Sequence, residues 1–273
     1  MKIKMRYKVM DLNDSELIFG LMAAFGCQEY SFEELKGLLD PFNVTQTSLR
    51  TNLSRMIKNN ILSSRKEGKS AFYRLGIKGG KISSNVSFSF KKLDWSQWDG
   101  SWWGILFTVP NMEKEQRHSI RKKLLAYRFS SLYPGFWIRP FHPNEKIEIH
   151  LETLINNEHC TLIRFDFFRE ITKDEISTIW RLDEVMHSFE TVIQTIREHL
   201  DRAHEYTPEE GLKYKLLVGN MIVNSLFEDP MLPDEFLPSH WKGDELRTLF
   251  KYFDSTMSDI AKPYVNKIIN AKL

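Results

Sequence analysis

The sequence predicts an α+β protein in which helices and a hairpin come first, a small mixed layer follows, and helices complete the chain. Three observations favour this class. Within 1–82, helical spacing of apolar residues gives way to two short β-rich runs. Between 95 and 170, strand-like and helical stretches alternate, and from 171 to 273 nearly every segment has helical spacing. We therefore expect three domains, at 1–82, 95–170 and 171–273.

The composition is that of an ordinary globular protein, with 42% hydrophobic and 27% charged residues. Its two cysteines, Cys27 and Cys160, are too few for a disulfide framework. No apolar run reaches the roughly 20 residues that cross a bilayer, and the basic start lacks the apolar stretch of a signal peptide. We expect a cytoplasmic protein with no membrane partner.

The first two predicted helices have clear start and stop signals. Asn13 or Asp14 can cap a helix over 15–24. Ser31 and Glu34 form a capping box for the next helix, and Pro41 ends it. A short connection then leads to a third helix at 45–58.

The third helix has two contrasting faces. At 100° per residue its apolar stripe consists of Leu49, Leu53, Met56 and Ile57. The opposite face carries Thr47, Ser48, Thr51, Ser54, Arg55 and Lys58, with Arg50 on its flank. Hydroxyls and long cations without a carboxylate suit a helix in the major groove of DNA, because both can donate to bases and phosphates. A neutral surface helix usually mixes both signs of charge.

A basic hairpin follows this helix. Two extended runs at 61–65 and 70–75 are joined by 66–69, where Gly68 permits a tight turn. Arg65, Lys66 and Lys69 are placed to meet phosphates. Over 41–81 the chain has nine Lys and Arg residues and a single acid, which is the charge pattern of a nucleic-acid contact. The order of helix, helix, polar helix and basic hairpin is typical of a winged helix-turn-helix.

The middle of the chain predicts a layered domain behind a linker. Gly79, Gly80 and the polar run 83–85 indicate the linker. Strand-like runs then alternate with helical ones, which is typical of a ferredoxin-like layer. The expected strands are 102–109, 136–141 and 160–167, and the expected helices are 114–127 and 147–154.

The last part of the chain predicts an all-helical domain. Capping boxes begin at Thr172 and Thr207, and three prolines interrupt the pattern within 229–238. A final helix is expected from Lys242 or Gly243. We expect this domain to pair subunits, to hold an effector, or both.

Several motifs spread along the chain resemble those of the PaaX family of bacterial regulators, named for a repressor of phenylacetate degradation. They are PFNV at 41–44, LRTNLSRM at 49–56, KSAFYRL at 69–75, WDGSW at 98–102, PGFWIRP at 134–140 and DPMLP at 229–233. Their order and spacing carry the resemblance, together with LP at 237–238, WKG at 241–243 and LF at 249–250.

The resemblance implies a winged-helix DNA reader, a ferredoxin-like middle domain and a helical C-terminal domain. It also implies repression that is relieved by an acyl-CoA thioester, phenylacetyl-CoA in the founding case. We expect a homodimer, because two-fold symmetry lets one protein read a palindromic operator in double-stranded DNA. The resemblance names no effector-binding residues.

Catalytic patterns do not stand out in the sequence, and we expect no enzyme, no metal and no cofactor. A metal-dependent nuclease with this middle fold needs an acid at the end of its first strand, and 103–110 has none. The main alternative is an RNA- or nucleotide-binding protein whose winged helix is an interaction module. The tryptophan-rich stretch 95–103 predicts either a platform for a ligand ring or packing between the first two domains.

Overall fold

The computed structural model describes residues 12–25, 29–107, 114–145, 151, 160–167 and 169–269. These residues form helices and two antiparallel sheets, so the predicted α+β class is confirmed. The chain divides into two compact units. The first comprises Met1–Lys91, Glu190–Leu226 and Glu245–Leu273, and the second comprises Lys92–Phe189 and Phe227–Asp244. The boundaries at 1–82, 95–170 and 171–273 stay predictions.

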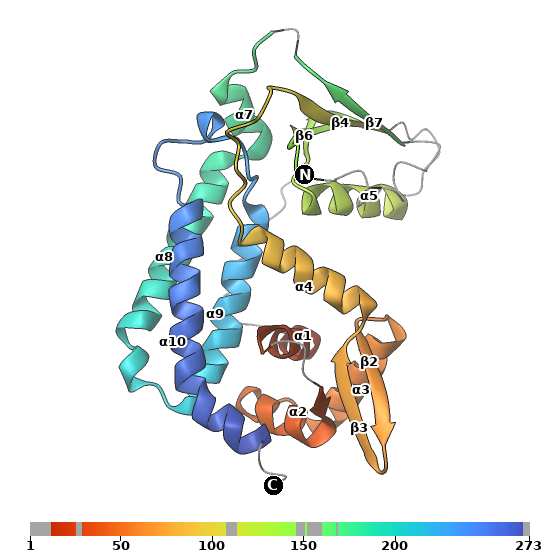
Figure 1. Cartoon of the computed structure of the whole chain (residues 1–273), viewed down its shortest axis with the longest axis vertical. Helices are drawn as coiled ribbons and strands as arrows, with labels where there is room; N and C mark the ends of the chain where they lie inside the picture. The colour runs from red at the N-terminus through yellow and green to blue at the C-terminus, as the bar shows by residue number, and fades with distance from the viewer. Residues whose placement is uncertain are drawn as a thin grey trace. The chain divides into compact units, whose positions relative to one another are not determined.

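The first unit begins with three helices and a hairpin (Figure 1). In chain order the elements are α1 (Asp14–Ala24), β1 (Tyr30–Ser31), α2 (Phe32–Leu39), a 3-10 turn (Asp40–Phe42), α3 (Gln46–Lys58), β2 (Leu62–Glu67), β3 (Ser70–Leu75) and α4 (Ile77–Ser89). Asn13 and Ser31 cap α1 and α2 in full capping boxes with Glu16 and Glu34. The predicted helix starts are confirmed.

The three helices bury their apolar stripes in one core. Buried side chains are Leu17, Ile18, Leu21 and Met22 from α1, Leu35, Leu38 and Leu39 from α2, and Leu49, Leu53 and Met56 from α3. Ile57, predicted in the stripe of α3, is only half-buried. Each fully buried Leu or Ile contributes about 1.5–3 kcal/mol, so this core holds the outward face of α3 in a defined orientation.

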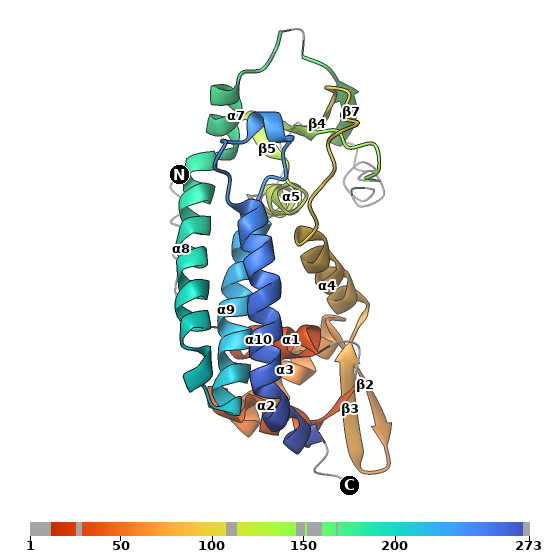
Figure 2. The same cartoon turned by 60° about the vertical axis from the view of Figure 1, so that its left-hand side comes forward.

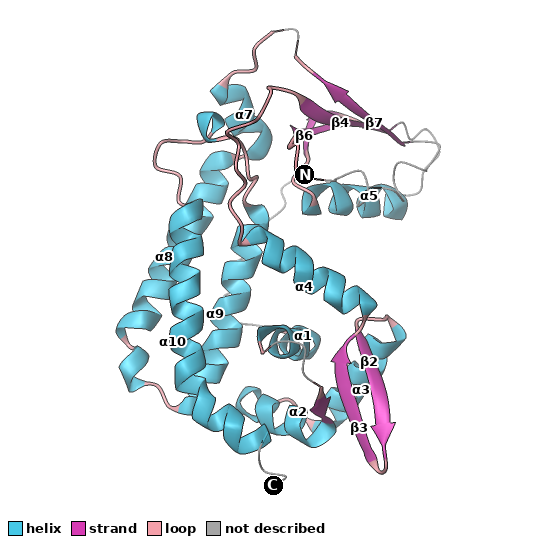
Figure 3. Cartoon of the chain, in the orientation of Figure 1, coloured by secondary structure: helices cyan, strands magenta, loops and turns pink. Residues whose placement is uncertain are grey.

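The hairpin is confirmed and its register is defined. Strands β2 and β3 pair antiparallel from Leu62 opposite Leu75 to Glu67 opposite Ser70. Gly68 in the turn has φ +59°, a left-handed conformation that glycine adopts at little cost. The sheet order is β1-β3-β2, and the hairpin stands out in magenta in Figure 3. Strand β1 was not predicted, because two residues are too few to show an alternating pattern.

The linker predicted at 79–85 is wrong, since these residues lie in helix α4. A Cβ atom at Gly79 would come within 2.1 Å of the carbonyl oxygen of Ile61, so this glycine allows close packing rather than flexibility. Serines in and just after this run are accommodated within the helix. Ser84 and Ser87 donate their hydroxyls to the carbonyls four residues earlier, at 3.0 and 3.1 Å.

Three long helices complete the C-terminal part: α8 (Leu182–Asp201), α9 (Pro208–Glu228) and α10 (Gly243–Ile269). Helices α9 and α10 lie side by side (Figure 2) and share the core of the first unit through Leu212, Leu216 and Val265. Tyr264 donates its hydroxyl to the carbonyl of Gly37 on α2 at 2.7 Å. The predicted box at Thr207 is confirmed, because Thr207 and Glu210 bond reciprocally.

The second unit holds a four-stranded antiparallel sheet of order β5-β6-β4-β7. Its elements are β4 (Trp102–Phe107), α5 (Lys114–Ala126), β5 (Ser130–Tyr133), β6 (Phe136–Pro140), β7 (Cys160–Phe165) and α7 (Lys173–Trp180). The strand β5 was not predicted. The helix expected at 147–154 lies outside the described residues except for Leu151, which is helical.

This sheet is covered on both faces within its unit. Along β4, Ile105 and Phe107 pack with residues of α5, whereas Trp102 packs with Ile176 and Trp180 of α7. Five of the six residues of β4 are buried or half-buried, and only Leu106 is exposed. Burial on both faces explains why β4 reads as a continuous apolar run instead of an alternating one.

Candidate nucleic-acid interface

Helix α3 is held by its cap and by its buried side. The hydroxyl of Thr45 accepts from the backbone N–H of Ser48 at 3.2 Å and starts the helix. With Leu49, Leu53 and Met56 buried, the opposite side of the helix must face outward. The predicted DNA-binding residues lie on that side.

Six of the seven residues predicted on α3 are exposed. They are Thr47, Arg50, Thr51, Ser54, Arg55 and Lys58. The seventh, Ser48, is half-buried and donates its hydroxyl to the carboxylate of Asp14 on α1. Helix α3 has no carboxylate of its own, so its exposed face presents hydroxyl and cationic donors.

Arg55 is oriented by two neutral partners. One guanidinium nitrogen lies 2.5 Å from the hydroxyl of Ser15 and 2.7 Å from the amide oxygen of Asn52. Ser15 also donates to Asn52 at 2.7 Å. Neither partner carries a charge, so Arg55 is positioned at the surface while its full positive charge stays available to a phosphate or a base.

Arg50 and Thr51 are also restrained. The guanidinium of Arg50 lies 4.7 Å from the centre of the Phe32 ring on α2, a cation–π contact. Thr51 donates its hydroxyl to the carbonyl of Thr47 at 3.0 Å. Such restraint lowers the entropy that binding would cost.

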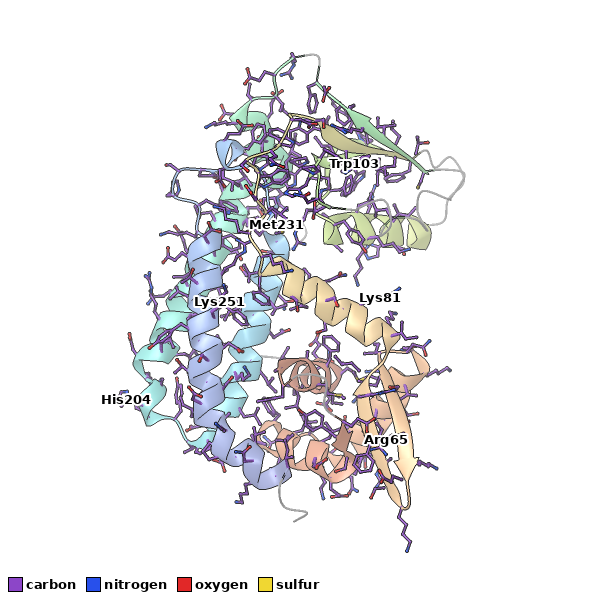
Figure 4. The ribbon with its side chains drawn as sticks, viewed as in Figure 1. Arg65, Lys81, Trp103, His204, Met231 and Lys251 are labelled. Atoms are coloured by element: carbon purple, nitrogen blue, oxygen red, sulfur yellow. The ribbon has the colours of Figure 1, made fainter. Side chains whose placement is uncertain are left out.

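On the hairpin, Arg65 has acidic partners instead. It contacts Glu67 on its own strand and Glu29 just before β1, both at 2.5 Å. Hydrogen bonds raise the pKa of Arg65, and the bond to Glu67 has a larger effect than the bond to Glu29. Its guanidinium also lies 4.7 Å from the Phe72 ring. Figure 4 labels Arg65 on the hairpin. Lys66 and Lys69 are exposed on the same hairpin.

Two residues that shape this surface were missed by the sequence analysis. Asn52 is buried on α3 and connects Ser48, Arg55 and α1. Its position between Ser48 and Arg55, four residues after one and three before the other, is the signal that could have revealed it. Glu29 carried no local signal, because it pairs with Arg65 only through the β1–β3–β2 sheet.

The described part of the chain shows neither a metal site nor a membrane-spanning helix. No group of three His, Cys, Asp or Glu side chains there is arranged to hold a metal ion. Among the same residues, no helix combines the length and apolarity that a bilayer crossing needs. Trp98 and Trp102 pack edge to face with each other and contact Phe236, so this part of the tryptophan-rich stretch belongs to the core of the second unit.

Family models match the chain in three consecutive stretches. Residues 16–79 match the model of PaaX-like proteins, residues 95–177 that of the PaaX protein central Cas2-like domain, and residues 180–267 that of the PaaX-like protein C-terminal domain. The transcriptional repressor PaaX of Escherichia coli strain K12 is 26% identical over 223 residues, which cover 79% of this chain and 70% of that protein.

A solved structure has a similar fold. The uncharacterized protein Rv0674 from Mycobacterium tuberculosis is 22% identical to this chain, with a TM-score of 0.61. The match covers 91% of this chain and 96% of the other.

Proposed function

Because the chain belongs to the PaaX family, we propose that it is a transcriptional repressor that binds an operator in double-stranded DNA. The observation that carries this proposal is the exposed face of α3, which offers hydroxyls and cations without a carboxylate. A regulator of this kind needs no catalytic centre, and the family relation places the chain among regulators rather than enzymes.

The DNA reader in this proposal is a winged helix-turn-helix. Its support is the order α1, β1, α2, α3 and hairpin, with the sheet order β1-β3-β2. Helix α3 enters the major groove, and Arg65, Lys66 and Lys69 of the hairpin meet phosphates. We assign base or phosphate contacts to Thr47, Ser48, Arg50, Thr51, Ser54, Arg55 and Lys58.

The middle layer is proposed to be ferredoxin-like. Two features support this assignment. The strands lie in the order β7-β4-β6-β5, so the last strand of this sheet in chain order lies beside its first, and α5 connects β4 to β5.

The proposal also includes a homodimer in the cytoplasm, since a palindromic operator is read by two copies of one reader. It further includes phenylacetate catabolism as the regulated process and an acyl-CoA thioester as the effector that releases the DNA.

The test is a salt titration of binding to duplex DNA from the protein's own promoter region, with a scrambled duplex as control. We expect selective binding, with the logarithm of the affinity falling linearly with the logarithm of the salt concentration, because bound cations release counterions from phosphates. Equal binding to the scrambled duplex, or preferred binding to single-stranded RNA, contradicts the proposal.

The same assay tests the effector. Phenylacetyl-CoA is added at a fixed salt concentration, with free coenzyme A as the matched control. If phenylacetyl-CoA releases the duplex and coenzyme A does not, the thioester is supported as the effector. Equal release by both compounds, or release by neither, contradicts this assignment. The oligomeric state is measured separately by light scattering.

A further inference from the structure

The first unit contains a cavity of about 1310 Å³. All its lining residues belong to that unit, and they come mainly from α1, α3, α4 and α9. The course of these helices can be followed in Figures 1 and 2. Ligand-binding pockets in proteins usually measure about 300–1,000 Å³, so the space is large enough for a small molecule.

One wall of the cavity is apolar. Ile82 and Val86 lie four residues apart on α4, so they share one face of that helix, and Phe90 directly follows its last residue. All three are half-buried. The ring of Phe90 stacks on that of Phe250 from α10, with centroids 4.3 Å apart and planes 10° apart. Leu216 and Val223 of α9 also line the space. Filling this space would remove apolar side chains from water.

The part of the lining that comes from α3 is mostly polar. It includes Ser48, Asn52 and Arg55, which belong to the network that joins α3 to α1. Thr47 and Thr51 line the cavity too. The hydroxyl of Thr47 and the remaining guanidinium nitrogens of Arg55 can donate to a carbonyl, hydroxyl or ether oxygen of a ligand.

The charges of the lining do not favour an anion. Two cations, Arg55 and Lys215, stand against three carboxylates, Asp14, Glu16 and Asp254. Lys215 is buried and pairs with Asp254, so its charge is already compensated. A ligand with several negative charges would be repelled, and an uncharged one would not.

Gly219 keeps the wall of α9 open. A Cβ atom there would have no neighbour within 4 Å, and Gly219 lines the cavity. Glycine inside a helix lowers the stability of the fold by roughly 0.5–1 kcal/mol relative to alanine. At this position the absence of a side chain leaves the cavity wider.

We propose that this cavity binds an uncharged molecule with an extended apolar body and an oxygen-bearing polar end. The apolar body lies against α4 and α9, and the polar end accepts hydrogen bonds from α3. Resting on the proposed function, the inference adds regulation: Thr47, Thr51 and Arg55 line the cavity and belong to the assigned DNA face. A ligand that engages these donors withdraws them from DNA, so each partner weakens the binding of the other.

The first experiment measures ligand binding in the absence of DNA. The full chain is titrated with 6-propionyl-2-(dimethylamino)naphthalene, an uncharged fluorescent probe whose ketone oxygen accepts hydrogen bonds, and with 6-(p-toluidino)naphthalene-2-sulfonate, a naphthalene probe that carries a sulfonate. We expect one saturable site per chain for the uncharged probe and at least about tenfold weaker binding of the sulfonate. Equal affinity for the two probes, or no saturable site for the uncharged one, overturns the proposed ligand class.

Two pairs of variants locate the site. Gly219→Trp fills the cavity, whereas Gly80→Trp adds the same bulk on α4, where Gly80 has open space and does not line the cavity. Val86→Asp places a carboxylate in the apolar wall, whereas Asn85→Asp adds the same charge on the exposed side of α4. The first member of each pair should weaken probe binding about tenfold, and its control should not.

Thermal midpoints identify which variants are folded. If both Gly219→Trp and Val86→Asp are folded and still bind the probe as the natural chain does, the ligand site does not lie in this cavity.

A further experiment adds saturating uncharged probe to the titration of the promoter duplex. We expect the probe to weaken DNA binding by the natural chain and to have no such effect on Gly219→Trp. Unchanged affinity overturns the coupling. If no duplex is bound selectively, the proposed function fails, but the probe titration still tests whether the cavity binds an uncharged ligand.

Discussion

Two arginines of the predicted DNA surface, Arg55 on α3 and Arg65 on the hairpin, have opposite surroundings. Arg55 is oriented by the hydroxyl of Ser15 and the amide of Asn52, which are neutral. Arg65 is held by the carboxylates of Glu29 and Glu67. The first keeps its charge for a partner, whereas the second must exchange carboxylates for phosphate.

This difference separates the roles expected of the two elements. An arginine with fixed geometry and full charge suits base recognition, which depends on the direction of its donors. An exposed arginine with nearby carboxylates contributes little net attraction, since water screens the pair and the opposite charges partly cancel. We therefore expect α3 to determine sequence preference and the hairpin to adjust overall affinity.

The largest effect on DNA binding is expected for Arg55→Ala. If Arg55 reads a base, affinity for the operator should fall by about 1–3 kcal/mol and sequence preference should relax. Fluorescence anisotropy with operator and scrambled duplexes measures both quantities. Lys36→Ala, an exposed cation on α2, is the control. An unchanged operator affinity would remove Arg55 from the interface and break the comparison.

Asn52→Ala tests the neutral support of Arg55. Asn52 is buried, and its loss leaves the hydroxyl of Ser15 without its acceptor. We expect the free energy of unfolding to fall by about 1–3 kcal/mol, as measured by chemical denaturation. Gln46→Ala, an exposed change on the same helix, should have little effect. Equal stability of the two variants would show that the network does not hold α3.

Glu29→Gln tests the acidic surroundings of Arg65. Removing this carboxylate frees the guanidinium for a phosphate, so binding to any duplex should strengthen. The salt dependence should steepen by about 0.9 in the slope of log affinity against log salt. Glu33→Gln, on α2, is the matched control. A slope that does not change would mean that Arg65 makes no phosphate contact.

The smallest effect is expected for Lys69→Ala at the tip of the hairpin. Lys69 is exposed, and a phosphate contact there carries no sequence information. Affinity should fall equally for operator and scrambled duplexes, with a salt slope shallower by about 1. A loss restricted to the operator would assign base reading to the hairpin and reverse the roles inferred above.

Local patterns predicted much of the fold because helices and hairpins depend on neighbouring residues. The capping residues Ser31 and Thr207 and the turn at Gly68 lie where their residue types indicated. The error at 79–85 has a physical cause. Glycine is read as flexible from sequence alone, yet at Gly79 it permits the close approach of α4 to the carbonyl of Ile61.

Spacing along the chain is enough to predict the α+β class and the polar, cationic character of α3. Which of those polar side chains have partners depends on the folded arrangement of the helices and strands. Ser48 and Arg55 meet α1, and Arg65 meets Glu29, through contacts between residues more than 30 positions apart. The cavity beside α3 arises in the same way, because its walls come from segments that only folding brings together.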